Sequence, residues 1–246
     1  EPFLGGGALL LSNVTRFKRF TGSDLYQPLI SLWVLLRDKP EIVIEQYRTL
    51  WNKLKQEVEA LDIEKDKGKN YPKLFYNCRD EFNRTQNPML LLFLSKTCLN
   101  GVIRFSKSGN FNNSFHHGRL GQKPEAFEKC VIKVSQAINS VHFLSANAID
   151  AVQDVGKRHF VFLDPPYFAS KNRYIENYSV TDLEQLLEHL NKSGAKWICA
   201  YDSRNNIELD KDLFRRHLSS TSYQSRIRRT GGQGLQNTSE SIYLNY

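Results

Sequence analysis

Short apolar runs that end in turn residues recur along the chain, and they predict an α/β fold built on short strands. The clearest run covers residues 160–163 and is followed at positions 164–167 by Asp-Pro-Pro-Tyr. Proline cannot donate to a strand ladder and holds the residue before it in an extended conformation, so the strand must end at this turn. Comparable short strands are predicted at residues 16–21, 141–144 and 197–201.

The stretch from residue 40 to residue 125 has a different pattern. Apolar residues at helical spacing and one strongly apolar run predict several helices there. A polar, turn-rich segment follows, and two β-like pieces on either side of residues 107–109 predict a hairpin. We therefore expect a mainly helical domain at 40–125, inserted between the two parts of a larger domain at 1–39 and 126–246.

The turn at 164–167 carries groups that suit a planar base bearing an amine. The Asp164 carboxylate and a backbone carbonyl of the turn can accept both hydrogens of an exocyclic NH2 group, and the Tyr167 ring can stack on the base. Pro165 and Pro166 donate no backbone hydrogen bond and stiffen the turn. An ordinary surface loop is the alternative, but Asp-Pro-Pro-Tyr directly after an apolar strand is uncommon and favours a functional site.

Polar residues follow two other predicted strands, and a glycine-rich turn opens the chain. Gly5, Gly6 and Gly7 leave room for a tight turn and for close approach of a ligand. Asp24 follows a strand where nucleotide-binding α/β folds often place an acidic residue that accepts from ribose hydroxyls. Asn147 follows a further strand. For the glycines, the alternative is a plain turn before a helix. For Asp24, the alternative is a helix N-cap. A Walker A loop is not expected because no Gly-Lys-Ser/Thr follows the glycines.

Composition limits the class of partner. The formal net charge of +8 and the pI near 9.3 favour a polyanion, either nucleic acid or an anionic membrane surface. No apolar stretch approaches the length that crosses a bilayer, and no secretory leader is visible. The four cysteines lie far apart and predict reduced thiols in a cytoplasmic protein, and the six scattered histidines do not predict a metal site.

The basic residues around the predicted hairpin indicate where a polyanion binds. Arg104 and Lys107 lie within the hairpin, and Arg119 follows in the same polar segment. A hairpin of this kind can enter a DNA groove, where an arginine donates two hydrogen bonds to guanine. An ordinary surface hairpin with Arg104 in a salt bridge is the alternative.

Taken together, these segments resemble one family of enzymes. Residues 3–7, Phe-Leu-Gly-Gly-Gly, resemble the F-x-G-x-G cofactor loop of S-adenosylmethionine-dependent methyltransferases, and the turn at 164–167 resembles their amino-methylating motif. Residues 100–104 and 109–112 resemble the N-G-x-x-R and G-x-F-N motifs of Dam-type DNA adenine-N6 methyltransferases. The order of cofactor loop, recognition insert and catalytic turn is that of the α-group, and the resemblance spans nearly the whole chain.

The resemblance implies a Rossmann-like catalytic core that binds S-adenosylmethionine, at 1–39 and 126–246, and a DNA-recognition domain at 40–125 that carries the hairpin. A catalytic turn would hold a target adenine that is flipped out of double-stranded DNA. Its residues are Asp164, Pro165, Pro166 and Tyr167. The implied cofactor-binding residues are Phe3, Gly5, Gly7, Asp24, Asn147 and Asp164. The implied DNA-binding residues are Leu99, Asn100, Val102, Arg104, Lys107, Asn112 and Arg119.

The expected activity is methyl transfer to N6 of adenine at a site such as GATC or GATATC. An RNA or cytosine-N4 amino-methyltransferase and a non-catalytic DNA-binding fragment are the alternatives. We expect a monomer in a bacterial or phage-type cytoplasm, without a metal or a membrane, and with a cognate restriction endonuclease as an optional partner that does not contact it. Family members usually carry a lysine-containing segment and a strand before the glycine turn, so we expect a further N-terminal piece before Glu1.

Overall fold

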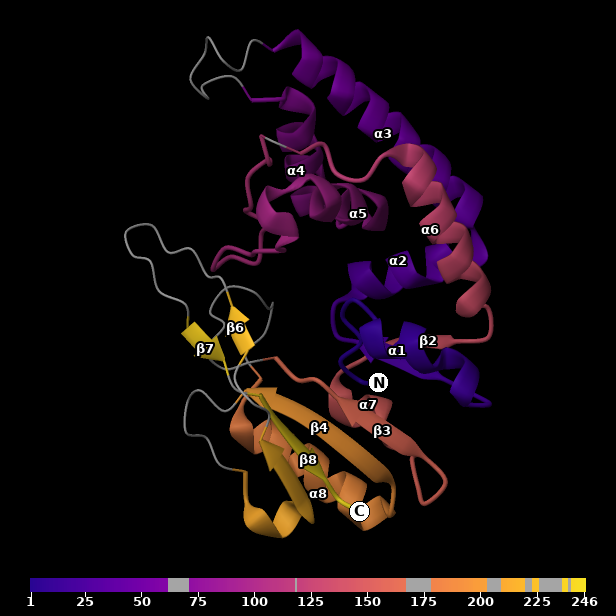
Figure 1. The fold of residues 1–246 in the computed structure, drawn as a ribbon, viewed down its shortest axis with the longest axis vertical. Helices are drawn as coiled ribbons and strands as arrows, with labels where there is room; N and C mark the ends of the chain where they lie inside the picture. The colour runs from indigo at the N-terminus through magenta and orange to yellow at the C-terminus, as the bar shows by residue number, and fades with distance from the viewer. Residues whose placement is uncertain are drawn as a thin grey trace.

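The computed structural model shows an α/β molecule in which a group of helices lies above a strand-containing half (Figure 1). The predicted α/β class is therefore confirmed. The described residues are 1–61, 71–117, 119–166, 178–202, 209–219, 223–225, 236–238 and 240–246.

Two parallel pairs of strands position the predicted site residues. In the first pair, Asp24 and Ser145 lie opposite each other at the carboxyl ends of β1 and β2. In the second pair, Leu163 at the end of β3 lies opposite Cys199 of β4. Carboxyl ends of parallel strands meet at one edge of a sheet, where open α/β folds bind their ligands. The bounds are β1 (Thr21–Asp24), β2 (His142–Ser145), β3 (Phe160–Leu163) and β4 (Lys196–Asp202).

Two further strands extend the second pair into a four-stranded sheet of order β3-β4-β8-β5. The strand β8 is antiparallel to both of its neighbours. A separate antiparallel pair, β6 and β7, completes the strands of the described residues. The bounds are β5 (Arg216–Ser219), β6 (Tyr223–Ser225), β7 (Gln236–Thr238) and β8 (Glu240–Leu244).

The prediction of a strand at 16–21 is wrong, whereas those at 141–144, 160–163 and 197–201 are confirmed within a residue. The observed strand begins at Thr21, and Val14–Arg16 forms a short 3-10 helix instead. Phe17, which suggested the earlier start, is 43% exposed and stacks on Phe160 at a centroid distance of 6.0 Å. Its aromatic ring packs outside the strand, so the apolar pattern was misleading here.

Helices cover the four-stranded sheet and form the upper part of the molecule (Figure 1). The four leucines that α8 buries pack with Leu163, Trp197 and Tyr201 in the core of the sheet. A second core joins α3, α4 and α5 with Phe105, Phe111 and Phe115 of the following segment. The bounds are α1 (Ala8–Asn13), α2 (Gln27–Asp38), α3 (Pro40–Ala60), α4 (Lys73–Thr85), α5 (Pro88–Thr97), α6 (Pro124–Ala137), α7 (Ala148–Ala151) and α8 (Val180–Ser193), with 3-10 turns at η1 (Val14–Arg16), η2 (Leu99–Gly101) and η4 (Lys211–Leu213).

Candidate functional site

Gly5 and Gly7 of the glycine turn are suited to their positions for different reasons. Gly5 and Gly7 both adopt positive φ angles, 47° and 62°, which side-chain-bearing residues rarely adopt. A Cβ at Gly7 would lie 2.7 Å from the Trp33 ring, so that position is closed by packing. A Cβ at Gly5 would meet no atom within 4 Å, so the space over Gly5 is open for a ligand.

Asp24 ties the glycine turn to the end of β1. One carboxylate oxygen accepts a hydrogen bond from Gly5 N at 2.9 Å, and the other accepts from Tyr26 N at 2.9 Å. Burial raises the pKa of Asp24, and the hydrogen bonds from Tyr26 and Gly5 act in the opposite direction. The N-cap residue of α2 is Tyr26, so Asp24 shapes the backbone before the helix and does not act as its cap.

Asn147 lies near Asp24, on the neighbouring strand end. Ala146 N donates to Asp24 O at 3.2 Å, which continues the pairing of β1 with β2. The Asn147 side chain is exposed and caps α7 by accepting from Asp150 N at 2.9 Å. Asn147 is therefore the N-cap residue of α7, and its contact with a cofactor stays a prediction.

Asp164, Pro165 and Pro166 follow directly after β3, as predicted. Leu163 is fully buried, Asp164 is exposed, and Pro165 is buried again, so the chain turns outward at the carboxylate. Tyr167 lies outside the described residues. Burial raises the pKa of the Cys199 thiol on β4, and the Asp164 charge adds to this rise.

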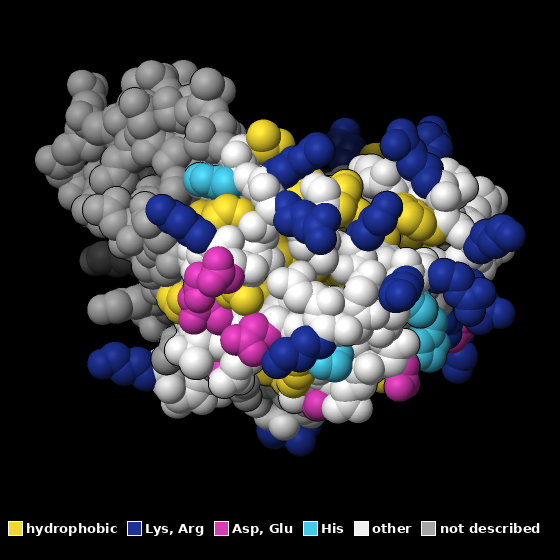
Figure 2. All heavy atoms as spheres, turned by 90° about the horizontal axis from the view of Figure 1, so that it is seen from below, with side chains coloured by type: hydrophobic (Ala, Val, Ile, Leu, Met, Phe, Trp, Pro, Cys, Tyr) yellow, Lys and Arg dark blue, Asp and Glu magenta, His cyan; other side chains and the backbone are white. Residues whose placement is uncertain are grey.

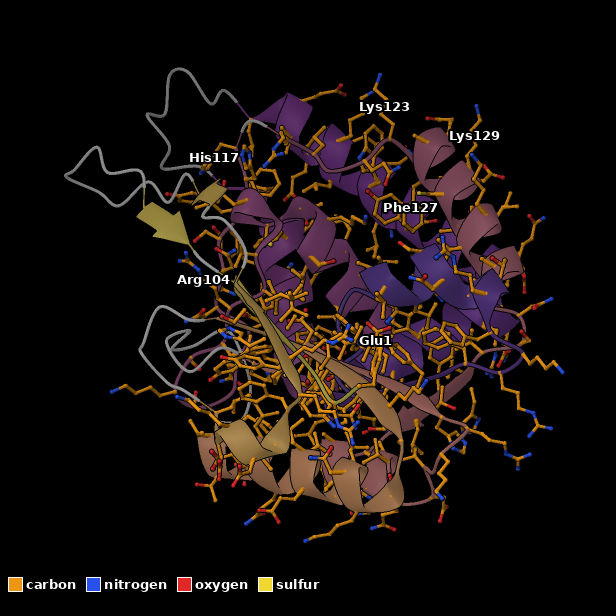
Figure 3. All side chains as sticks on the ribbon, turned by 60° about the horizontal axis from the view of Figure 1, so that its bottom comes forward. Glu1, Arg104, His117, Lys123, Phe127 and Lys129 are labelled. Atoms are coloured by element: carbon orange, nitrogen blue, oxygen red, sulfur yellow. The ribbon has the colours of Figure 1, made fainter. Side chains whose placement is uncertain are left out.

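The start of the chain and the residues after β3 lie close together, although they are far apart in the sequence. Burial raises the pKa of the Glu1 carboxyl to about 7, and the nearby Asp164 charge contributes in the same direction. Phe3 packs against the core of the four-stranded sheet and meets Tyr178 edge-on at 5.1 Å. Glu1 lies in the middle of the molecule (Figure 3).

The predicted hairpin is present, closed by a tight turn and not by long strands. Phe105 and Phe111 form an antiparallel bridge, and Ser106 N donates to Asn110 O at 2.7 Å. Asn112 N donates to Arg104 O at 3.0 Å, so these two predicted DNA contacts are neighbours across the hairpin. Phe105 and Phe111 are buried, which leaves Arg104 and Asn112 exposed by strand alternation.

The predicted DNA-binding residues lie on the surface of this segment. Arg104 forms no ion pair with any residue in the described part of the chain, so the salt-bridge alternative finds no support there. Val102 is half-buried, whereas the exposed predicted contacts are Leu99, Asn100, Arg104, Lys107, Asn112 and Arg119.

Positive charge extends beyond the hairpin. Figure 2 shows Lys and Arg side chains over much of the face seen from below.

Among the described residues, no three His, Cys, Asp or Glu side chains are grouped as metal ligands. None of the described helices has the length and apolar character needed to span a membrane.

Comparison with known proteins agrees with this arrangement. The family model described as D12 class N6 adenine-specific DNA methyltransferase matches residues 1–230, and the chain belongs to this family. The type II methyltransferase M.MjaIII of Methanocaldococcus jannaschii is 31% identical over 215 residues, which cover 80% of this chain and 70% of that protein. The predicted family is thereby confirmed.

Two relatives are DNA adenine methylases. The Serratia marcescens protein is 26% identical over 226 residues, covering 87% of this chain and 76% of its own. The Escherichia coli protein is 27% identical over 171 residues, covering 68% of this chain and 55% of its own. The match therefore spans about half the length of the Escherichia coli enzyme.

Proposed function

We propose that the chain transfers a methyl group from S-adenosylmethionine to N6 of an adenine flipped out of a specific double-stranded DNA site. The observation that carries this proposal is that Phe3 of the glycine turn packs against the core that contains Leu163 of β3, while Glu1 lies close enough to Asp164 for their charges to interact. A recognition hairpin with Arg104 on its surface supports DNA as the substrate. By the family's implied specificity, the site would resemble GATC or GATATC.

The residues at the carboxyl edge fit the cofactor. The open space over Gly5 admits a ligand close to the backbone, and the Asp24 carboxylate at the strand end retains lone pairs that can accept from ribose hydroxyls. Phe3 and Gly7 would line the methionine side, and Asn147 would lie near the adenine ring. When bound, S-adenosylmethionine supplies a methyl group that is already activated by the sulfonium charge.

The catalytic turn would activate the target amine. The adenine N6 lone pair is delocalised into the ring, so this nitrogen is a weak nucleophile. Asp164 and the Pro165 carbonyl would accept its two hydrogens, localise the lone pair and stabilise the positive charge that develops on N6. Tyr167 would stack on the base, and Pro166 would keep the turn stiff. Positioning and electrostatics then account for the rate without a covalent enzyme intermediate.

The recognition segment would select the site and stabilise the flipped state. Base flipping costs a few kcal/mol, which stacking and filling of the vacated space partly offset. Arg104 would read a base edge, and Leu99, at 42% exposure, is an apolar side chain available to fill the gap. Phosphate contacts from Lys107 and Arg119 would position the duplex.

The role of the activity in a cell belongs to the same proposal. M.MjaIII is named a type II methyltransferase. We propose that this enzyme acts as a monomer in a bacterial or phage-type cytoplasm. Where a cognate endonuclease exists, the two would meet only through their shared DNA site.

The first test uses tritiated S-adenosylmethionine and short duplexes that contain GATC, GATATC or neither. We expect label on adenine N6 in one duplex only. Label on cytosine N4, or on RNA in preference to DNA, would replace the proposed substrate. Specific DNA binding without any transfer would indicate a non-catalytic reader.

The second test removes the catalytic carboxylate. Asp164→Ala should lower the rate of methyl transfer by at least about a thousandfold, because one of the two acceptors that localise the lone pair is lost. DNA affinity, measured by fluorescence anisotropy, should stay within about threefold, since Asp164 meets the base only after flipping. Loss of DNA binding with unchanged turnover would reverse this assignment.

A further inference from the structure

The residues before the hairpin form a tight turn with unusual backbone geometry. Asn100 and Gly101 both have positive φ angles, 59° and 64°, and Val102 N donates to Leu99 O at 3.4 Å. Positive φ at both central residues defines a type I′ turn, for which Asn-Gly is the preferred pair. Leu99 and Asn100 are exposed at this turn, so its conformation decides where their side chains point.

A buried amide on the other side of the segment holds this turn. Asn113 is 5% exposed, and its Nδ2 donates to Leu99 O at 2.9 Å and to Val102 O at 2.7 Å. Its Oδ1 accepts from Ser114 N at 2.9 Å. The side chain therefore uses both donor hydrogens and its acceptor on backbone groups, and it joins the first and last residues of the turn.

We propose that Asn113 is a positioning residue that sets DNA discrimination by fixing the turn of residues 99–102. This inference rests on the proposed function, because it concerns how the same DNA site is read. Asn113 does not touch the DNA itself. It holds the Leu99 and Asn100 backbone in the conformation that enters the duplex, so that binding does not have to order the turn.

The chemistry of the amide explains why this residue type suits the position. Two carbonyls converge on Nδ2. Without its two donors, Leu99 O would keep only the long hydrogen bond from Val102 N at 3.4 Å, and Val102 O only the weak one from Cys98 Sγ at 3.5 Å. An aspartate keeps the acceptor for Ser114 N but loses both donors, and its charge would face two carbonyl oxygens. A serine keeps one donor. Asn113→Asp removes both donors at nearly constant size, whereas Asn113→Ser is smaller and keeps one hydroxyl donor, so the two variants form a graded series.

A matched control exists in the other half of the molecule. Asn191 on α8 donates through Nδ2 to Leu213 O at 2.8 Å and accepts from Trp197 Nε1 at 2.9 Å. Asn191→Asp makes the same atomic change to another amide, one that joins a backbone carbonyl to the Trp197 side chain. It should lower the thermal midpoint without changing how DNA is read.

The test measures kcat and the KM for DNA on the preferred duplex and on a duplex altered at one base pair of the site. Asn113→Asp should raise the KM for the preferred duplex about tenfold and reduce the discrimination ratio about tenfold, which corresponds to about 1.4 kcal/mol. The kcat should stay within about threefold, and Asn113→Ser should fall between the two. Hydrogen exchange of the peptide covering residues 99–102, in the free protein, should be faster in both variants.

Several outcomes would overturn the proposal. A lower thermal midpoint with an unchanged KM and discrimination ratio would make Asn113 merely structural. The same loss of discrimination in Asn191→Asp would attribute the effect to general destabilisation. Unchanged hydrogen exchange at residues 99–102 would show that Asn113 does not hold the turn. Failure of the proposed function is distinguishable, because the unaltered protein would then methylate no duplex.

Discussion

The proposed cofactor edge, at Gly5 and Asp24, and the proposed recognition turn, at residues 99–102, are each held by one side chain. The two side chains have opposite hydrogen-bonding roles, one as acceptor and one as donor. At the cofactor edge, the Asp24 carboxylate accepts two N–H groups, from Gly5 and Tyr26. At the recognition turn, the Asn113 amide donates to two carbonyls, of Leu99 and Val102. In each place one side chain bonds two backbone groups beside a surface where a ligand is proposed. The type of side chain therefore follows the backbone groups that face it: an acceptor where N–H groups converge, and a donor where carbonyl groups converge.

The difference in charge matters for the ligand. A carboxylate at Asp24 places negative charge near a proposed cofactor that carries a sulfonium and ribose hydroxyls. Burial makes that charge costly, as the raised pKa of Asp24 shows, and its two N–H partners reduce the cost. A carboxylate in place of Asn113 would face the Leu99 and Val102 carbonyl oxygens and be repelled by them. A neutral amide avoids this repulsion.

In this comparison, the largest effect should come from removing the Asp24 carboxylate from the proposed cofactor edge. Asp24→Ala removes the two carboxylate oxygens that accept from Gly5 N and Tyr26 N, together with the proposed ribose contact, so S-adenosylmethionine affinity should fall at least about a hundredfold. The free energy of unfolding should fall by about 2–4 kcal/mol, since two charge-assisted hydrogen bonds are lost. Calorimetric titration and denaturant unfolding measure the two quantities.

The control for this prediction is Asp24→Asn, which keeps one acceptor oxygen. It should lose less stability than Asp24→Ala. Equal cofactor affinity in the unaltered protein and in Asp24→Ala would remove Asp24 from the cofactor site and leave it a structural role only.

Much of the candidate site followed from local sequence. Residues 164–167 could be placed at a strand end because proline cannot continue a strand, and the end of β3 confirms this. Asp24 was placed at a strand end, although the strand itself was shifted by the exposed Phe17. The hairpin was predicted from its turn residues, and the bridge at Phe105 confirms it.

The hydrogen bonds by which Asn113 and Asn83 hold the backbone could not be predicted, because their partners are backbone groups far away in the sequence. Asn113 bonds to Leu99, 14 residues earlier, through a carbonyl that has no sequence signature. Asn83 likewise accepts from Phe111 N at 2.7 Å and donates to Phe111 O at 3.1 Å, across 28 residues. Nothing in the composition of either region indicates which asparagine faces inward. Only packing of the helices against the hairpin brings these pairs together.

An intermediate effect should come from removing the Arg104 guanidinium, which is proposed to read a base edge. Arg104→Ala should cost about 1–3 kcal/mol of DNA binding and relax the preference at one base position, if the guanidinium meets a guanine. Lys107→Ala is the matched control, because a phosphate contact weakens all duplexes alike and reduces the salt dependence. Binding to a panel of single-base variants at two salt concentrations separates the cases. A uniform loss in Arg104→Ala would make it a phosphate contact.

The smallest effect should come from Tyr26, which lies between the two regions. Its N–H donates to Asp24, its ring meets Phe105 of the hairpin edge-on at 5.5 Å, and its hydroxyl donates to Gln86 at 3.4 Å. Tyr26→Phe should change little, because the hydroxyl contact is long and exposed. Tyr26→Ala should reduce, by about threefold to fivefold, the factor by which S-adenosylmethionine strengthens DNA binding, which corresponds to about 1 kcal/mol.

This coupling is measured as the ratio of DNA dissociation constants with and without saturating cofactor. The backbone bond to Asp24 survives in both Tyr26 variants, so cofactor affinity in the absence of DNA should stay unchanged. A ratio of one in the unaltered protein would mean that the two regions act independently. An equal loss in Tyr26→Phe would move the coupling from the ring to the hydroxyl. A loss in Tyr26→Ala alone would assign the coupling to the Tyr26 ring, which packs against the helical core that includes Phe105.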